Sequence, residues 1–563
     1  MRRIVPIALA LLTAALLSKE AVAQTAAYDR PTVNFVLLTY GDSYDAPTSA
    51  FFKKIPPEEK FYFNELNTRE LKLRQQSRQT PLPTAWQAAQ AELTLQNVAK
   101  QEVAAWYLRK LDGSMSMELI HRRGEFNATD EAFLMATATK RGMDELKDLG
   151  QKLISKTYVV LVDYNSITYS ANVATDMHTW KSVARAMVFR LKFDGNVENS
   201  IYDAWQDEQD TPEAQAEKGK RFDQIPFELE FVQQVSVKAS ASALITGKTR
   251  SDQSTLQTLA KSAFRVQPKD ALMNEMLGNG YRGLMNELEK KVPAFKVLSG
   301  VWELDPIRSK IGRKEGLRTD QRYYVLEYEQ DRRGQLKSVR KAVVRVSSVA
   351  DNYGMATGKS EASSFYQVAG QRVEKGMTLE QRNDAGLGVL LGANTPLSGD
   401  AYFSTELRLE LLTRVIPSLY VYGEGTLEGA RYALSSSFKV DYELTGNGKE
   451  DYLFARAGFG FGKNIHFWRN FSLSPYVGMG WEFTSAKQIS LETMYFKGGA
   501  NFALNIYYPL QLVGGVSGLL YGSPSSSKKD DDGNKISFSS YGKVFSERSS
   551  VGAAVFMGVR FNF

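Results

Sequence analysis

The sequence predicts an α+β multidomain protein: an α/β domain, a small β-rich domain and a C-terminal eight-stranded antiparallel transmembrane β-barrel. Two observations predict this class. Residues 551–563 alternate apolar with small or polar side chains up to Phe563, and similar strand-like segments recur from residue 386 onward. Before residue 295, helical and strand-like patterns are mixed, which is typical of a globular α/β or α+β domain.

The N-terminus has the pattern of a secretory leader. Arg2 and Arg3 precede an apolar run, and Ala21-Val22-Ala23 fits a small-residue cleavage site, so residues 1–23 are predicted to be a signal peptide. An uncleaved anchor is the alternative, although the run is short for a span of about 20 residues. No later segment offers 18 consecutive apolar residues, which leaves a barrel as the way to cross a bilayer.

Composition excludes several classes of site. The 563 residues are enough for about three domains. They contain no cysteine, which excludes disulfides, thiolate metal sites and a cysteine nucleophile. The three histidines are scattered, so no metal site and no cofactor are expected. The formal net charge of +7 is too small to indicate a nucleic-acid partner.

An α/β domain is predicted over residues 24–294. Strands are expected at 32–38, 116–121, 157–164, 183–194 and 227–246, and helices at 84–110, 129–155 and 253–291. The small β-rich domain follows at 295–383. Within it, residues 311–327 followed by 373–382 resemble the compact SH3-like β-barrels of some secreted envelope-assembly proteins, which hints at the fold only.

The barrel is predicted over residues 384–563, from segments whose two faces are apolar and polar as lipid and lumen require. Its strands are expected at 386–394, 403–415, 418–430, 452–465, 471–483, 494–508, 510–522 and 551–563. Short connections near 416–417, 464–470 and 508–509 alternate with longer ones near 395–402, 431–451, 485–493 and 523–550. This alternation predicts that both barrel ends, and therefore the N-terminal domains, face the periplasm.

Charged residues are predicted on the lumen face of these strands. Eight strands leave room only for side chains, so opposite charges are expected to form a hydrogen-bonded plug. The alternative is a narrow ion path. The expected network consists of Glu406, Arg408, Glu410, Arg414, Glu424, Glu428, Arg456, Glu482, Lys497 and Arg560.

The C-terminal segment resembles the small eight-stranded outer-membrane barrels of the OmpA/OmpX type. Its ending, with Val559, Phe561 and Phe563 on one face, resembles the terminal strand that the barrel-insertion machinery recognises. The resemblance implies a bacterial outer-membrane protein held in outer-membrane lipid, and it implies no catalytic residues.

One motif could indicate an enzyme. Gly41-Asp42-Ser43 follows a predicted strand and resembles the first block of GDS-type lipases and esterases, in which the serine is the nucleophile. That family also needs an Asp-x-x-His pair, because the serine must hand its proton to an oriented base. Here Asp176 precedes His178 by two residues rather than three. The simpler interpretation is a turn after the strand.

The sequence thus predicts an outer-membrane-anchored envelope protein without enzymatic activity. Its periplasmic region is expected to bind or scaffold an unidentified protein or glycan partner and to help organise an envelope complex. A GDS-type hydrolase using Ser43 and a narrow channel or uptake protein are the alternatives.

Overall fold

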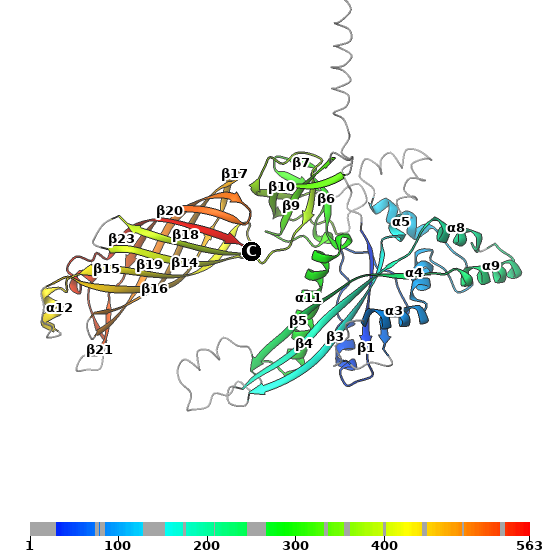
Figure 1. The fold of residues 1–563 in the computed structure, drawn as a ribbon, viewed down its shortest axis with the longest axis horizontal. Helices are drawn as coiled ribbons and strands as arrows, with labels where there is room; N and C mark the ends of the chain where they lie inside the picture. Colours follow the sequence, from blue (N-terminus) through cyan, green and yellow to red (C-terminus); the bar gives the residue numbers. More distant parts are fainter. Residues whose placement is uncertain are drawn as a thin grey trace, which may run out of the picture.

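The computed structural model describes residues 30–73, 78, 85–127, 152–172, 176–207, 209–244, 266–330, 336–353, 361–397, 401–441, 448–486, 489–529 and 535–563. These residues form three β-sheets. The seven-stranded sheet lies between the barrel and the α/β region (Figure 1). The predicted signal peptide and most of the predicted helix at 129–155 lie outside the described residues.

The α/β region is built on a five-stranded sheet in the order β2-β1-β3-β4-β5. β1 runs parallel to β2 and β3, and the remaining pairs are antiparallel. The strands are β1 (Thr32–Thr39), β2 (Glu70–Lys72), β3 (Thr157–Asn172), β4 (Met177–Leu191) and β5 (Leu229–Leu244). All but β2 were predicted, β1 and β3 from apolar runs buried on both faces and β5 from an alternation of buried and exposed residues.

Helices cover both faces of this sheet. They are α2 (Asp45–Phe52), α3 (Ala85–Leu95), α4 (Val98–Trp106), α5 (Glu118–Asn127), α8 (Gly195–Asp203), α9 (Pro212–Gln224) and α11 (Lys269–Lys291). Leu277 of α11 and Val160 of β3 belong to one core, whereas Trp106 of α4 and Val159 of β3 belong to the other. Successive side chains of β3 thus point into opposite cores, as the pleat of a strand requires.

Two local predictions in this region are wrong. The single helix expected at 84–110 is two helices, separated at Asn97, whose φ is 53°. The strand expected at 116–121 is instead the start of α5, where the amide of Glu118 donates to Ser116 Oγ at 3.2 Å. Leu119, Ile120 and Arg123 are buried together, a spacing that fits a helix rather than a strand.

The small domain is a seven-stranded antiparallel sheet in the order β6-β12-β9-β10-β11-β8-β7. Its strands are β6 (Leu298–Gly300), β7 (Glu303–Leu304), β8 (Ile307–Ser309), β9 (Arg322–Gln330), β10 (Leu336–Ser348), β11 (Ser363–Gly370) and β12 (Thr378–Gln381). Tyr323, Val344 and Phe365 lie in its core. Its resemblance to SH3-like barrels stays a prediction.

The C-terminal region is a closed barrel of eight antiparallel strands, which confirms the prediction. The strands are β13 (Leu387–Pro396), β14 (Ala401–Leu412), β15 (Leu419–Tyr432), β16 (Glu450–Lys463), β18 (Phe471–Ala486), β19 (Ile489–Tyr507), β20 (Leu510–Tyr521) and β23 (Val551–Asn562). Each pairs with the next, and β23 pairs with β13 to close the barrel.

Further short elements lie at the ends of the barrel. They are β17 (Ile465–Trp468), α12 (Ser436–Asp441), β21 (Ser525–Lys529), β22 (Lys535–Ser537) and η3 (Tyr541–Lys543). The long connection expected at 485–493 is wrong, because β18 and β19 continue until Ala486 pairs with Ile489. Leu491 and Thr493 are buried there, so the alternation extends past the predicted strand ends.

No helix among the described residues is long and apolar enough to cross a membrane.

Candidate functional site: the charged lumen and the barrel mouth

The outer surface of the barrel is apolar on every strand. Large hydrophobic side chains point outward and are exposed, whereas their neighbours along each strand point into the lumen. Representative outward residues are Leu391, Leu407, Leu427, Phe459, Trp481, Phe502, Leu512 and Met557. Soluble proteins rarely expose apolar patches beyond a few hundred Å², so a belt around a whole barrel requires an apolar environment.

A first charged cluster occupies the lumen between β14, β15 and β19. Lys497 Nζ donates to Glu406 Oε2 at 2.8 Å and to Glu424 Oε2 at 2.9 Å. Arg408 Nη2 donates to Glu406 Oε1 at 2.8 Å and to Glu424 Oε2 at 3.2 Å. All four side chains are buried, and their charges balance. A buried charge is tolerated when it is paired in this way.

A second balanced cluster lies nearer the end of the barrel that carries α12. Arg456 Nη1 donates to Glu428 Oε2 at 2.7 Å and to Glu482 Oε2 at 3.0 Å. Arg548 Nη2 donates to both oxygens of Glu482 at 2.9 Å. The hydroxyl of Tyr541 also donates to Glu482. Glu482 therefore joins two arginines and a tyrosine while being fully buried.

Arg548 and Tyr541 were not among the predicted lumen residues, because both belong to the longer connection expected at 523–550 rather than to a predicted strand. Part of this connection instead folds into the barrel. Tyr541 and Phe545 are buried against Phe454, and the guanidinium of Arg548 lies 3.6 Å from the centre of the Phe454 ring. We call residues 538–549 the plug segment. Its aromatic side chains were the signal that could have indicated burial.

A third balanced pair lies at the opposite end. Arg560 Nη2 donates to Glu410 Oε1 at 3.1 Å, and Arg560 Nη1 donates to Gln511 Oε1 at 3.1 Å. Gln511 in turn donates to Asn505 Oδ1 at 2.9 Å. Asn505 Nδ2 then donates to the carbonyl of Val368, at 2.9 Å, in the small domain. The polar lumen is thus continuous with the barrel mouth.

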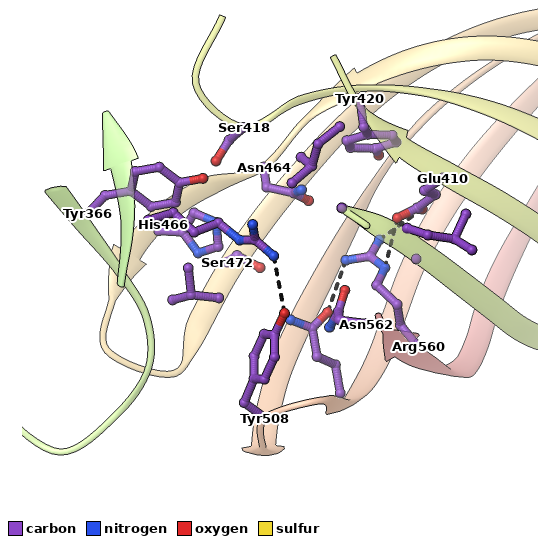
Figure 2. A pocket seen from close by; sticks show the side chains of 17 residues that line it. Tyr366, Glu410, Ser418, Tyr420, Asn464, His466, Ser472, Tyr508, Arg560 and Asn562 are labelled. Atoms are coloured by element: carbon purple, nitrogen blue, oxygen red, sulfur yellow. Dashed lines mark hydrogen bonds and ion pairs between the residues drawn. The ribbon is translucent and has the colours of Figure 1, made fainter. Parts of the chain in front are cut away.

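The small domain covers this mouth. Residues of the small domain and of the barrel together line a cavity of about 50 Å³ between them (Figure 2). Arg345 of the small domain pairs with Asp384 and donates to the hydroxyl of Tyr508, at 3.1 Å, on the turn between β19 and β20. The rings of Tyr366 and His466 stack with centroids 5.1 Å apart. These contacts hold the small domain against the turns of the barrel.

Asp320 reinforces the same contact. Its Oδ1 accepts from the amide of Ser418, at 2.9 Å, and from the hydroxyl of Tyr366, at 2.8 Å. Burial raises the pKa of Asp320 above its usual value, although the two hydrogen bonds oppose this shift. Arg414, predicted in the lumen network, instead lies on the following turn and donates to the carbonyl of Asp384 at 2.7 Å. Arg414 therefore lies at the barrel mouth rather than in the lumen, because β14 ends at Leu412.

The predicted assembly signal lies on the last strand. Phe561 and Phe563 are exposed on its outer face, Val559 is partly exposed on the same face, and Arg560 between them is buried. Recognition of these residues by an insertion machinery stays a prediction.

The motif at Gly41–Ser43 forms a turn held by aspartates. Asp45 accepts from the amides of Tyr40, at 3.0 Å, and Gly41, at 2.5 Å. Arg78 binds both Asp42, at 2.9 Å, and Asp45, at 2.5 Å. Ser43 is exposed. A hydrolase built on this serine stays a prediction.

Asp176 and His178, the imperfect partners of that motif, lie together where β3 turns into β4. His178 Nε2 is 3.6 Å from Asp176 Oδ1, and its Nδ1 contacts the hydroxyl of Tyr169 at 2.5 Å.

A fully buried carboxylate lies in the α/β region. Glu102 accepts from Asn34 Nδ2 at 2.5 Å and from Asn64 Nδ2 at 2.8 Å. Burial raises its pKa to about 7, against the opposing effects of the two amide hydrogen bonds and of Arg123. No group of three or more possible metal ligands occurs within the described ranges.

Comparison with protein-family models and with curated protein sequences finds no match. Solved structures similar to this chain include a major outer membrane protein from Thermus thermophilus, at 16% identity and TM-score 0.23. That match covers 31% of this chain and 98% of the other. The outer membrane protease OmpT from Escherichia coli matches at 8% identity and TM-score 0.16, over 44% of this chain and 94% of the other. OmpT from Vibrio cholerae matches at 8% identity and TM-score 0.13, over 43% and 97%. Likenesses of this size show no family for the chain.

Proposed function

We propose that this protein is an outer-membrane protein whose barrel anchors a periplasmic region that binds or scaffolds a protein or glycan of the cell envelope. One observation carries the proposal: a closed eight-stranded barrel exposes apolar side chains on every strand and buries charged side chains such as Arg408, Glu482 and Lys497 in its lumen. This is the inverse of a soluble barrel and fits a hydrocarbon environment.

The paired charges of the lumen favour an anchor over a channel, even though Arg456, Lys497 and Arg548 line a cavity of about 290 Å³ beside the clusters. Each of the three lumen clusters is neutral as a whole, and the plug segment and the small domain cover the two ends. Opening a path would separate buried ion pairs, which is strongly destabilising. The barrel then serves to hold the other domains at the membrane.

The end of the barrel at which the N-terminal domains lie supports a periplasmic location for them. The amides of Gly386 and Leu387, where the barrel begins, donate to the carbonyl of Phe563, at 3.1 and 3.4 Å. Figure 1 places the C-terminus at the end of the barrel that faces the small sheet. The two longest connections of the barrel, 433–449 and 522–550, lie at the opposite end, and in outer-membrane barrels the longer loops are extracellular.

The N-terminal domains are tied to the barrel rather than tethered by a loose linker. Asn470 Oδ1, on a barrel turn, accepts from the amide of Gly370 at 2.7 Å. Gly370 has a φ of 104°, and a Cβ there would lie 2.4 Å from the carbonyl oxygen of Lys341, so only glycine fits this contact. On the other side, Glu289 of α11 accepts from Asn383 and Gln381. A fixed position at the membrane raises the effective concentration for an envelope partner.

Substitution of a belt residue should test the membrane anchor. Leu391 is exposed at the middle of β13, and Leu391→Arg should lower the yield of folded barrel in the outer membrane by placing a charge in lipid, at a cost of about 2 kcal/mol. Val415→Arg is the matched control, because Val415 is also exposed but lies on a turn. Heat-modifiable mobility of membrane fractions measures both. Equal yields of the two variants would contradict the membrane assignment.

Single-cysteine labelling should test the orientation, since the chain contains no cysteine of its own. Val440→Cys on α12 should react with a membrane-impermeant maleimide on intact cells. Leu111→Cys in the α/β region, also exposed, should react only after the outer membrane is permeabilised. Labelling of Leu111→Cys on intact cells would place the domains outside and overturn the periplasmic assignment.

A further inference from the structure

The sheet of the small domain extends past the rim of the barrel. Over the mouth, Tyr366 of β11 stacks on His466 of the barrel (Figure 2). At the end of β11, the amide of Gly370 donates to Asn470 on a turn of the rim, and the pairing of β11 with β10 ends there as well. The rest of the β9–β10 hairpin therefore continues beyond the rim. We call it the overhang, residues 326–330 and 336–341.

One face of the overhang is turned the same way as the face that covers the mouth. Arg340 lies opposite Leu326, and Leu326 shares a face of β9 with Tyr324 and Tyr328. Tyr324, at the rim, belongs to one hydrophobic cluster with Tyr508 of the β19–β20 turn. Past the rim this face is open, and Tyr328 is 52% exposed. If lipid surrounds the barrel, as in the function proposed above, this face meets the leaflet beside the mouth.

Three arginines surround Tyr324. The guanidinium carbons of Arg340, Arg382 and Arg322 lie 4.8, 5.5 and 5.6 Å from the centre of its ring. Arg340 is exposed, and no ion pair joins it to another of the residues that the structure describes. A guanidinium group that rests on an aromatic face keeps N–H groups at its edge, and these match the oxygens of a phosphate.

The carboxylates near these arginines are too few to neutralise them. Glu380 pairs with Arg382 at 3.3 Å, and it also pairs with Lys296 at 2.9 Å. Arg322 is 3.7 Å from Asp384, a carboxylate that two further arginines share. The cluster around Tyr324 therefore carries an excess of positive charge that an anion would neutralise.

The excess charge belongs to this domain and to this face. Residues 295–383 contain 17 Lys and Arg residues against 11 Asp and Glu residues, which accounts for most of the formal net charge of +7. On the opposite face of the hairpin, Lys341 pairs with Glu327 at 2.9 Å and with Glu329 at 2.5 Å. Unlike that face, the face turned toward the leaflet keeps its charge available.

We propose that the three arginines around Tyr324 bind the phosphate of an anionic phospholipid in the leaflet that surrounds the barrel mouth. The position selects this occupant, because the anionic group at that depth of a membrane is the lipid phosphate. Trp468 and Tyr507 are exposed beside the same rim, and such rings favour the level of the headgroups. The proposal rests on the membrane anchor proposed above and adds a lipid contact for the small domain.

Native mass spectrometry of the full-length protein tests the site. The protein is released from nanodiscs that contain mostly phosphatidylcholine and a minor fraction of phosphatidylglycerol, and wild type should retain phosphatidylglycerol preferentially. Arg340→Ala should lower this retention about fivefold. Lys337→Ala is the matched control, because Lys337 is exposed on the same strand but points to the opposite face. Equal retention by Arg340→Ala and wild type would overturn the site.

Inorganic phosphate distinguishes a lipid from a free anion. The acyl chains of a bound lipid also lie against the apolar belt, so millimolar phosphate should leave most of the phosphatidylglycerol bound. Complete displacement would show that the site takes free phosphate and would overturn the assignment to a lipid.

Fluorescence quenching tests the lipid contact without changing an arginine. Bimane attached to Tyr328→Cys should be quenched by lipids with a headgroup nitroxide at least twofold more than bimane at Lys337→Cys. Bimane at Leu391→Cys, quenched by nitroxides on the acyl chains, reports the anchor. Quenching at Leu391→Cys with equal quenching at the two hairpin positions would overturn the lipid contact alone. An unquenched Leu391→Cys would refute the anchor, and this proposal with it.

Discussion

Replacement of Glu482 by glutamine should destabilise the barrel by about 3–5 kcal/mol, the cost of leaving a buried charge without its partner. Glu482 is fully buried and accepts from Arg456, Arg548 and Tyr541. Glutamine has nearly the same shape, so the loss would come from charge rather than from packing. After the change, Glu428 alone would face two arginines.

Urea unfolding of the barrel in lipid vesicles measures this effect. Glu492→Gln is the control, because Glu492 on the adjacent strand β19 forms an exposed ion pair with Lys535. Exposed pairs contribute about 0–1 kcal/mol, so this variant should unfold almost as wild type does. Similar midpoints for Glu482→Gln and wild type would show that the lumen clusters do not stabilise the barrel.

The stability of the α/β region should fall by about 3 kcal/mol between pH 4.5 and pH 7 because of Glu102 alone. Burial raises the pKa of this carboxyl from 4.5 to about 7, so the folded protein binds its proton more tightly than the unfolded chain does. The resulting stabilisation is complete below pH 4.5 and is lost as the pH rises through 7. A shift of one unit corresponds to about 1.4 kcal/mol, which gives the stated size.

Hydrogen exchange of the β1 and α4 amides, corrected for the pH dependence of intrinsic exchange, reports this stability. Glu102→Gln should remove most of the change with pH, whereas Glu65→Gln, at an exposed position, should keep it. A wild-type protein whose corrected protection is flat between pH 4.5 and 7 would contradict the shifted pKa.

The barrel was predictable because membrane and lumen impose opposite demands on alternate residues. Leu407 and Leu409 face outward while Glu406 and Arg408 face inward, and this two-residue period is visible in the sequence alone. The same period places all eight strands within a few residues of their observed bounds. Exceptions occur at strand ends, as with Arg414, because the alternation alone does not say where pairing stops.

The contacts between segments were not predictable from local patterns. The plug segment has no strand or helix period, and its burial depends on Phe454 and Glu482, which lie far away in the sequence. Asn505 has the pattern of an ordinary lumen residue, yet it hydrogen-bonds the small domain. The charge balance of each lumen cluster likewise emerges only when β14, β15, β16, β18, β19, β23 and the plug segment are brought together.

The position of the plug segment in the chain has a consequence for the order of assembly. Residues 538–549 directly precede β23, the strand that pairs with β13 and seals the barrel. Pairing of β13 with β23 joins residues far apart in the sequence, so it carries the greatest loop-closure cost and should come late. Until the plug segment arrives, Glu428 and Glu482 have only Arg456 between them. Arg548 would therefore complete this charged cluster only when the barrel closes, because the segment that carries Arg548 leads directly into β23.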